Sequence, residues 1–497
     1  MDIEKLLSSY FCRINNIDLN KCYSIEIVDA CDLLVKERID LVAKIKYVEF
    51  KDKGYDLSFI KELYAAHIEA FSLGSFSEPG NSEKNTIEKY IKTFDNLIDN
   101  IKNNGINKDK SVIPVGYNNA ILDGAHRVAI AAYYKLKVPI IRFNNLSATY
   151  DVKYFKERLL DERYIDYLVN EYCKLKGNQF VACVWPKAKD KDKRKELDAL
   201  INNSCEVIYK KKIKVGYDGL HNLMFQIYSG QGWIGNIKNN FEGAKNKRDA
   251  CYDKNEILTA YVIENISFED VLNLKKKIRD IFNIGNHSIH ITDTKEEVVQ
   301  MVNLLLNENS VQFLNNGKPN HYVQFNHFID KLKAKLIEYN LPLEEFTIDS
   351  SSTMALYGLR DVEDIDFLTI SKEYKVLEDD YFHNHHDFVK YYNQTLDNLV
   401  LNPQNYFYFS DLKFTTLDVI LEFKKNRFEY KDQVDVKLIE NIMKKKSKLN
   451  LALLKLESSI KRTVRNIKMN IKKLIIISVK KMGVYNYVKR IYKSLRG

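Results

Sequence analysis

The sequence is poor in cysteine, proline and tryptophan, and it has no long apolar run. Its 497 residues include 7 Cys, 7 Pro and 2 Trp. The cysteines are scattered without a Cys-x-x-Cys pair, which excludes a disulfide framework and the common zinc motifs. No stretch approaches about 18 consecutive apolar residues, and the N-terminus lacks the apolar core of a signal peptide. We therefore expect a cytoplasmic protein with reduced thiols and no membrane-spanning segment.

Positive charge is concentrated at one end of the chain. The net charge is +10, and residues 444–497 hold 17 Lys and Arg against one acidic residue, Glu457. Removing the +16 of this tail leaves residues 1–443 at −6. An acidic body offers no general electrostatic attraction to nucleic acid, so nucleic acid is disfavoured as a partner.

The basic tail also has helical periodicity. Apolar residues recur at spacings of three and four along one stripe, at Leu453, Leu456, Ile460, Val464, Ile467, Ile471 and Leu474. A basic amphipathic helix of this kind suits an anionic membrane surface, and the run LIIISV is too short to span one. We therefore predict a peripheral protein on the inner face of the plasma membrane. The alternatives are a helix packed on the protein's own core and a nucleic-acid arm.

The length predicts several domains, and the pattern of elements predicts their class. Strand-like runs such as FVACVW and TAYVIEN alternate with helix-like runs such as FEDVLNLKKKIRDIF, which indicates α/β and α+β domains in series. We expect a helical N-terminal segment, a small α/β domain, a central α/β domain, a mixed sheet with helices, and the basic amphipathic tail. Their boundaries are 1–75, 76–150, 175–315, 320–440 and 444–497.

The segment 320–440 contains the strongest candidate for chemistry, FTIDSSSTMALYGLRDVEDIDFLTI. Small hydroxyl residues precede a short apolar helix, and Asp364 and Asp366 then open an apolar strand. Because strand side chains alternate, the two carboxylates share a face and suit a divalent cation such as Mg²⁺. A further apolar stretch, LKFTTLDVIL, is expected to be a strand carrying Asp418, whose burial needs a partner or a metal. In the simplest alternative, the two aspartates only cap a surface strand.

This pattern resembles the DNA polymerase β-like nucleotidyltransferase superfamily. The resemblance implies that Ser351 and Ser352 bind the nucleotide phosphates. It also implies that Asp364, Asp366 and Asp418 bind Mg²⁺ and carry catalysis, with an NTP (ATP or CTP) as the donor. Ser351 stands where that superfamily usually has glycine.

A second candidate lies in ILDGAHRVAIAAYYKLKVPI, where a turn separates a strand-like from a helix-like run. Free backbone N–H groups at a helix start, together with an arginine, make an anion site. The stretch 89–143 resembles the ParB/sulfiredoxin superfamily, whose Gly-x-His-Arg motif holds nucleotide phosphates. The resemblance implies that Gly124, His126 and Arg127 bind phosphate, with Asp123 near a metal or acceptor. The alternative is a buried His and a salt-bridged Arg that stabilise a turn.

Two details refine this second resemblance. Ala125 stands inside the motif and no sulfiredoxin cysteine is present, which disfavours peroxiredoxin repair. Glu78, in the preceding loop, is a weaker candidate for a metal ligand or base.

The central segment 175–315 matches no family motif. It combines Trp233, Gly235, Gly243, Lys245 and Lys247 in one loop-rich stretch and two histidines in HSIHITD. We interpret the histidines as structural, with a second transferase site as the alternative.

Together these features predict a Mg²⁺-dependent nucleotidyl- or phosphotransferase at the inner membrane surface. By analogy, it would act in bacterial cell-surface polysaccharide biosynthesis on a small-molecule or lipid-linked glycan acceptor, and the ParB-like segment would be a kinase or nucleotide sensor. One alternative is a nucleic-acid-associated protein of partition or toxin–antitoxin type, and another is a nucleotide-binding scaffold without chemistry. The sequence carries no signal for an oligomeric state.

Overall fold

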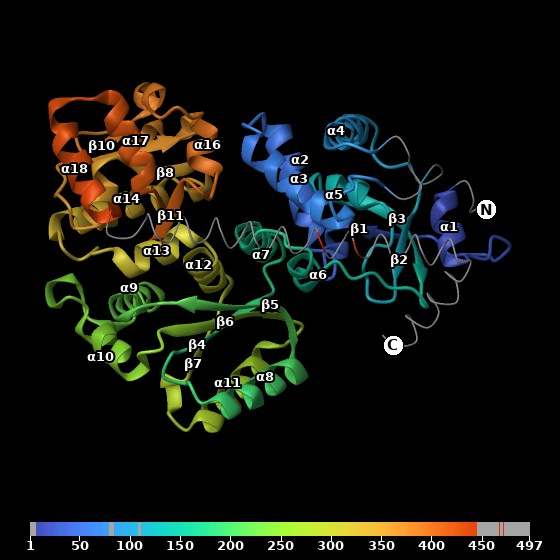
Figure 1. The fold of residues 1–497 in the computed structure, drawn as a ribbon, viewed down its shortest axis with the longest axis horizontal. Helices are drawn as coiled ribbons and strands as arrows, with labels where there is room; N and C mark the ends of the chain where they lie inside the picture. Colours follow the sequence, from blue (N-terminus) through green and yellow to red (C-terminus); the bar gives the residue numbers. More distant parts are fainter. Residues whose placement is uncertain (1–5, 79–83, 108–110, 445–466, 468–470, 472–497) are drawn as a thin grey trace. The chain divides into compact units, whose positions relative to one another are not determined.

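The computed structural model describes residues 6–78, 84–107, 111–444, 467 and 471. The chain divides into two compact units, Met1–Asn426 and Arg427–Gly497. Within the described residues, the strands form three separate sheets, all of them in the first unit (Figure 1). The expected mixture of helices and sheets in a multidomain chain is therefore present.

The N-terminal sheet joins strands that lie far apart in the sequence, in the order β1-β3-β2. β1 runs antiparallel to β3, whereas β2 runs parallel to it. β1 lies within residues 1–75, the segment expected to be helical, and it pairs with β3 of the segment 76–150. The two segments therefore share one sheet. The elements are α1 Ser9–Asn15, β1 Glu26–Asp29, η2 Ala30–Leu33, α2 Asp40–Lys53, α3 Ser58–Ser72, α4 Ile87–Asn104, β2 Ile113–Gly116, α5 Ala125–Tyr133, β3 Lys137–Phe143, α6 Val152–Glu157 and α7 Glu162–Lys176.

The strand, turn and helix expected around Gly124 are present in that order. After β2 the chain turns at Asn119, which has a φ of 58°, and Ile121 bridges back to Val115. The expected second strand is reduced to this single bridge. α5 then starts directly after Gly124, and three of its four alanines, Ala129, Ala131 and Ala132, are buried. The turn therefore places the start of α5 beside Ile113, the first residue of β2.

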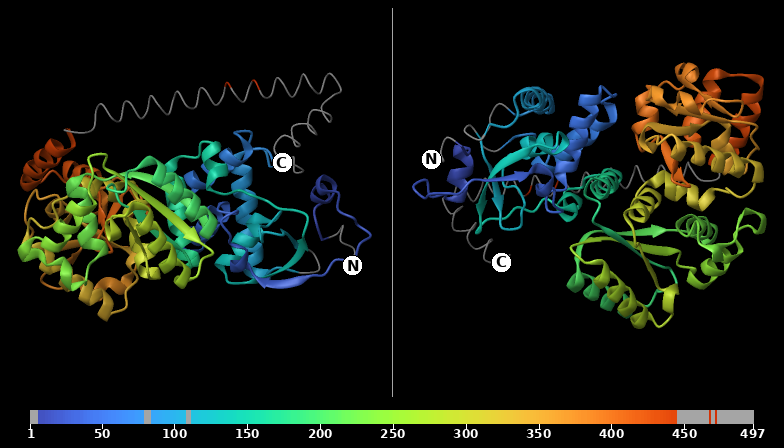
Figure 2. Two further views of the ribbon diagram at one scale, coloured as in Figure 1. Left: turned by 90° about the horizontal axis from the view of Figure 1, so that it is seen from below. Right: turned by 180° about the vertical axis from the view of Figure 1, so that it is seen from behind.

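The central sheet is wholly antiparallel, in the order β5-β6-β4-β7. Its chain order, with α8 after the first strand and α11 after the third, is a split β-α-β arrangement. α8 and α11 cover one face, and α9, α10 and α12 lie on the other side (Figure 1; Figure 2, right). The elements are β4 Phe180–Val184, α8 Lys191–Ser204, β5 Glu206–Lys214, α9 Tyr217–Ile227, η3 Gly232–Ile234, η4 Ile237–Asn239, α10 Glu242–Cys251, β6 Ile257–Glu264, α11 Phe268–Phe282, η5 Gly285–His287, β7 Ile289–Ile291, α12 Lys295–Leu305 and α13 Glu308–Asn316.

The C-terminal sheet is mixed, in the order β10-β9-β8-β12-β11. β8 is antiparallel to β9 and parallel to β12, and β10 is parallel to β9. The ends of β8 and β12 therefore meet the starts of β9 and β10 at one end of the sheet. The elements are α14 Val323–Glu338, η6 Leu343–Glu345, β8 Phe346–Asp349, α15 Ser351–Leu356, β9 Ile365–Thr369, η7 Lys372–Leu377, β10 Phe382–Asn384, η8 His386–Tyr391, α16 Leu396–Leu401, β11 Tyr406–Phe409, β12 Leu412–Thr415 and α17 Leu417–Arg427.

The second unit contains α18, Tyr430–Lys444, whose start is stabilised by a 2.7 Å ion pair between Arg427 and Asp432. Nearly all of the basic tail predicted to bind a membrane surface lies outside the described residues. Among the described residues, no helix combines the length and the apolar character needed to cross a bilayer.

Candidate functional site

One end of the C-terminal sheet gathers the two predicted metal-binding aspartates. Asp366 is the second residue of β9, and Asp364 directly precedes that strand. Strand alternation puts both carboxylates on the same face, as their spacing predicts. The neighbouring strand β8 ends at Asp349, which lies opposite Asp366 in the antiparallel register. Three carboxylates therefore converge where β8 ends and β9 begins.

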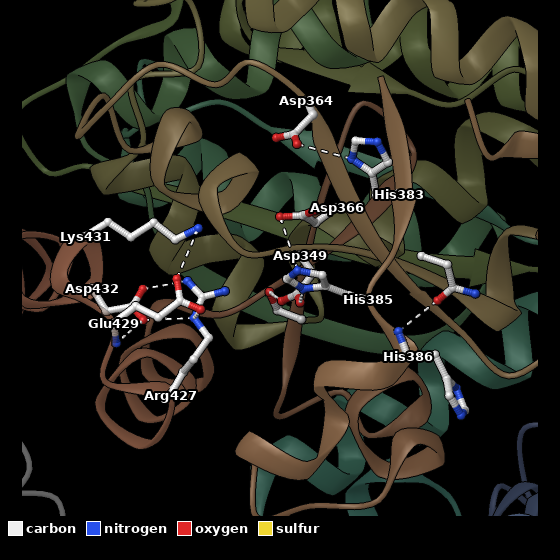
Figure 3. A network of polar contacts seen from close by, with 12 residues as sticks. Asp349, Asp364, Asp366, His383, His385, His386, Arg427, Glu429, Lys431 and Asp432 are labelled. Carbon is white, nitrogen blue, oxygen red and sulfur yellow. Dashed lines mark hydrogen bonds and ion pairs between the residues drawn. The ribbon is translucent and has the colours of Figure 1, made fainter. Parts of the chain in front are cut away.

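A histidine from the next strand completes the group. His383 lies in β10, opposite Asp366, and its Nδ1 is 3.2 Å from the Oδ2 of Asp364 (Figure 3). One ligand atom from each of Asp364, Asp366 and His383 lies within 4.8 Å of the others. In the described part of the chain, no other group of three or more His, Cys, Asp or Glu residues has this geometry.

A buried hydrogen-bond network around Asp349 contacts this group through His385. Asp349 is fully buried and accepts hydrogen bonds from the Oγ1 of Thr415 at 2.9 Å and the hydroxyl of Tyr392. The Nδ1 of His385 lies 3.0 Å from the Oδ2 of Asp349, and its Nε2 lies 3.6 Å from Asp366. His385 thus bridges the buried carboxylate and the candidate ligand, an arrangement that orients ligands in metal sites (Figure 3).

The two carboxylates joined by His385 have pKa values shifted in opposite directions. Burial raises the pKa of Asp366, and the nearby charges of Asp364 and Asp349 add to the rise, against the opposing effect of His385. Burial alone would also raise the pKa of Asp349, but hydrogen bonds from His385 and Tyr392 outweigh it and lower that pKa. A cation beside Asp366 would relieve the repulsion among these carboxylates.

The turn between β8 and α15 is strained. Ser350 has a φ of 57° and a ψ of −125°, a conformation that favours glycine. Ser351 and Ser352, which were expected to precede the helix, form the first turn of α15. The Oγ of Ser352 is buried without a hydrogen-bond partner among the described residues. Strain and an unpaired hydroxyl next to converging carboxylates are typical of functional sites.

The prediction that Asp418 lies on a strand is wrong. β12 ends at Thr415, and Asp418 is an exposed residue in the first turn of α17. Thr416 starts this helix, because its Oγ1 accepts a hydrogen bond from the amide N of Val419. Asp418 does not belong to the group formed with His383, and Asp349 instead supplies the third nearby carboxylate.

The predicted phosphate motif forms the N-terminus of α5. Gly124 has a φ of 86°, and a Cβ at this position would lie 2.7 Å from an Nη of Arg127 and 2.8 Å from Ile113. The positive φ favours glycine at this position, and a Cβ there would also displace the ends of the Arg127 and Ile113 side chains. Asp123 accepts hydrogen bonds from the amide N of Gly124 at 2.6 Å and from the Oγ of Ser8 at 3.2 Å. Its carboxylate thus holds the turn.

His126 and Arg127 have different surroundings. His126 is 2.8 Å from the hydroxyl of Tyr64 and packs against Phe94, and burial followed by the charges of Lys44 and Lys84 keeps its pKa well below the usual value. This fits the structural alternative for His126. Burial lowers the pKa of Arg127, against the opposing charge of the nearby Asp123 carboxylate. Of the two side chains, Arg127 is therefore the one whose charge suits an anion, with Asp123 as its neighbouring counter-charge.

Comparison with models of protein families, with curated proteins and with solved structures gives no match for this chain. The site residues that sequence analysis missed are Asp349, His383 and His385. The sequence did contain a signal for the two histidines. In HNHH, His383 and His385 are two residues apart, the same spacing as Asp364 and Asp366, which is typical of side chains on one face of a strand. No spacing rule, however, places β10 beside β9.

Proposed function

We propose that the segment 320–440 is a divalent-metal-dependent nucleotidyl- or phosphotransferase. The observation that supports this proposal is the convergence of Asp364, Asp366 and His383, with all three ligand atoms within 4.8 Å. Oxygen ligands suit Mg²⁺, and an imidazole raises the affinity for Mn²⁺ and other transition metals. The resemblance to the nucleotidyltransferase superfamily supports the same reaction class.

In this proposal, some residues bind the cation and others position its ligands. Asp364, Asp366 and His383 would hold the cation, which when bound neutralises phosphate charge and polarises the reacting phosphoryl group. Asp349 would act through His385, which keeps the carboxylate of Asp366 in place. The strained turn at Ser350 brings α15 to the same end of the sheet.

The substrates follow from the proposed chemistry and the charge distribution. An NTP, ATP or CTP, would be the donor. A small-molecule or lipid-linked glycan would be the acceptor, in cell-surface polysaccharide biosynthesis at the inner face of the plasma membrane. The basic tail favours that location, because anionic lipid attracts clustered Lys and Arg. The start of α5 would bind nucleotide phosphates through its backbone N–H groups and through Arg127, which lies beside the Asp123 carboxylate.

The test is turnover by the full-length protein. It is incubated with each labelled NTP, with Mg²⁺ or Mn²⁺, and with a bacterial metabolite and lipid extract, and products are identified by mass. Asp366→Asn and Asp364→Asn are each expected to lower turnover by about a hundredfold or more, the scale of losing one transition-state charge partner. His383→Ala is expected to reduce turnover with Mn²⁺ more than with Mg²⁺, because imidazole favours the transition metal.

Asp330→Asn is the matched control. Asp330 is an exposed aspartate on α14 outside the cluster, and its replacement should leave turnover unchanged. Turnover that survives Asp366→Asn would overturn the site. Nucleotide binding without any product would favour the scaffold, and steeply salt-dependent RNA or DNA binding by a chain lacking 444–497 would favour the nucleic-acid alternative.

A further inference from the structure

A row of four rings crosses the central unit from its core to its surface. Trp185 is fully buried, and its ring stacks 6.5 Å from that of His290 on β7. Tyr228, which follows α9, contacts His290 at 5.3 Å and Trp233 at 5.1 Å. Trp233 ends the row with 47% of its surface exposed. We call these four residues the ring row.

The chain holds this exposed tryptophan in a fixed position. The indole Nε1 of Trp233 donates a 2.6 Å hydrogen bond to the Oε1 of Gln231. α10 runs directly against the backbone of Trp233, because a Cβ on Gly243 would lie only 1.9 Å from the Trp233 carbonyl oxygen. Only glycine permits that approach. The close approach fixes the backbone of Trp233, and the hydrogen bond to Gln231 orients its exposed indole, which offers a stacking surface to an aromatic ring.

Basic side chains from two helices converge on the same strand. The Nζ of Lys275 on α11 donates to the carbonyl of Ile291 at 3.0 Å, directly beside His290, and also reaches Asp293 at 3.1 Å. Arg279 lies one turn further along α11. The Nζ of Lys247 on α10 donates to the carbonyl of Asn286, in the loop before β7.

Two of these three cations lack a counter-charge. In the described part of the chain, neither Lys247 nor Arg279 makes an ion pair with a carboxylate, and only Lys275 is paired, with Asp293. Burial and then the charge of Lys275 lower the pKa of His290, and Lys247 and Arg279 act in the same direction, against Asp293. Glu297 on α12 accepts a hydrogen bond from the backbone amide of Asp293. Among the charged groups that act on His290, the three cations therefore outnumber the one carboxylate, Asp293.

Two hydrogen-bond donors near β7 are buried without partners in the described part of the chain, one in the core next to His290 and one on α11. The Nε1 of Trp185, in a side chain that is fully buried, and the Nε of Arg279 have no hydrogen-bond partner among the described residues. His290 is 9% exposed, and its ring contacts are aromatic. Buried donors need hydrogen-bond acceptors, and cations without an ion pair need a counter-charge. A bound anion would provide both.

We propose that this edge of the central sheet binds a phosphate ester, with the phosphate held by Lys247, Arg279 and His290 and the attached ring stacked on Trp233. Arginine and lysine together provide the planar and point-like donors that phosphate accepts. An indole face stacks on any aromatic base. The site is separate from the proposed transferase group at Asp364 and Asp366, and it does not depend on that proposal.

The experiment uses the only two tryptophans of the protein, because Trp185 and Trp233 both belong to the ring row. Their intrinsic fluorescence therefore reports this site. The full-length protein, in a phosphate-free buffer, is titrated with inorganic phosphate, ribose 5-phosphate and uridine monophosphate. We expect a saturable fluorescence change with uridine monophosphate, at least tenfold weaker binding of ribose 5-phosphate, and the weakest binding of inorganic phosphate.

Variants identify the binding groups. Arg279→Gln and Lys247→Gln should each weaken uridine monophosphate binding at least tenfold, and Lys276→Gln, an exposed neighbour on α11, is the matched control. Trp233→Phe should remove most of the fluorescence change while the emission of buried Trp185 reports an intact core. Asp366→Asn should leave the affinity unchanged.

Three outcomes would overturn the proposal. The first is no saturable change with any of the three phosphates. The second is an affinity that Arg279→Gln and Lys247→Gln leave at the level of Lys276→Gln. The third is an affinity lowered by Asp366→Asn as much as by Arg279→Gln, since the fluorescence change would then report the transferase site. Equal affinity for ribose 5-phosphate and uridine monophosphate would overturn the stacking role of Trp233.

Discussion

Asp349→Asn tests whether the buried network supports the candidate site. Asp349 accepts side-chain hydrogen bonds from Thr415 and His385 at 2.9 and 3.0 Å and from Tyr392, and a backbone hydrogen bond from Ser350. Asparagine keeps one acceptor oxygen and turns the other into a donor, so at least one bond and the charge facing His385 are lost. A hydrogen bond to a charged group contributes about 1.5–3 kcal/mol, and breaking a buried ion pair costs about 3–5 kcal/mol. We therefore expect a local destabilisation of about 2–4 kcal/mol.

Hydrogen exchange measures this local effect. The first unit contains three sheets, so its global unfolding is not expected to be two-state, whereas amide protection reports each strand. Amides of β8 and β12 should exchange roughly 30- to 1,000-fold faster in Asp349→Asn, since each 1.4 kcal/mol is about a tenfold change. Asp330→Asn, which removes an exposed aspartate, should change nothing measurable. Wild-type protection of β8 in Asp349→Asn would refute the reasoning.

The pH dependence of the same variant has a definite sign. The pKa of Asp349 is lowered in the folded protein, so its stabilising contribution is present above the ordinary aspartate pKa of about 3.9. The contribution declines as the pH falls below that value, and it is lost once the pH passes the lowered folded pKa. The difference in β8 amide protection between wild type and Asp349→Asn should therefore shrink in acid. A difference that widens in acid would contradict the assignment of Asp349 as the charged partner.

The remaining predictions concern the first sheet and the tail. Asp40→Asn removes the fully buried carboxylate that pairs with Arg38 at 2.8 Å and Lys44 at 2.7 Å, and it should destabilise the protein by about 3–5 kcal/mol. The control is Asp192→Asn, which breaks an exposed ion pair. If Asp40→Asn and Asp192→Asn have the same thermal midpoint, the buried cations Arg38 and Lys44 need no carboxylate partner. Deleting residues 444–497 should abolish binding to phosphatidylserine vesicles in a flotation assay, and unchanged binding would exclude the tail as the membrane anchor.

The sequence predicted those features of the fold and site that depend on neighbouring residues. The two-residue spacing of Asp364 and Asp366 fixes a shared face on any strand, and the hydroxyl run before MALYGL marks the start of a helix. Gly124 marks a turn for the same local reason, because its φ of 86° excludes most side chains. The Asp418 error was also local. The pair Thr416 and Asp418 is an N-cap followed by an acid in the first turn, a helix-start signal outweighed by the apolar run around it.

Tertiary structure alone decided which distant residues share a site. His383 and His385 join the aspartates because β10 pairs in parallel with β9 across a connection of more than ten residues, and pairing at that distance depends on packing of the whole sheet. In the same way, the contact of Trp233 with Tyr228 and the convergence of Lys247 with Arg279 arise where α10 and α11 meet β7. Residue order encodes each strand's face and each helix's start. Only the assembled sheet, with its distant strands paired, brings together the charges that give a site its chemistry.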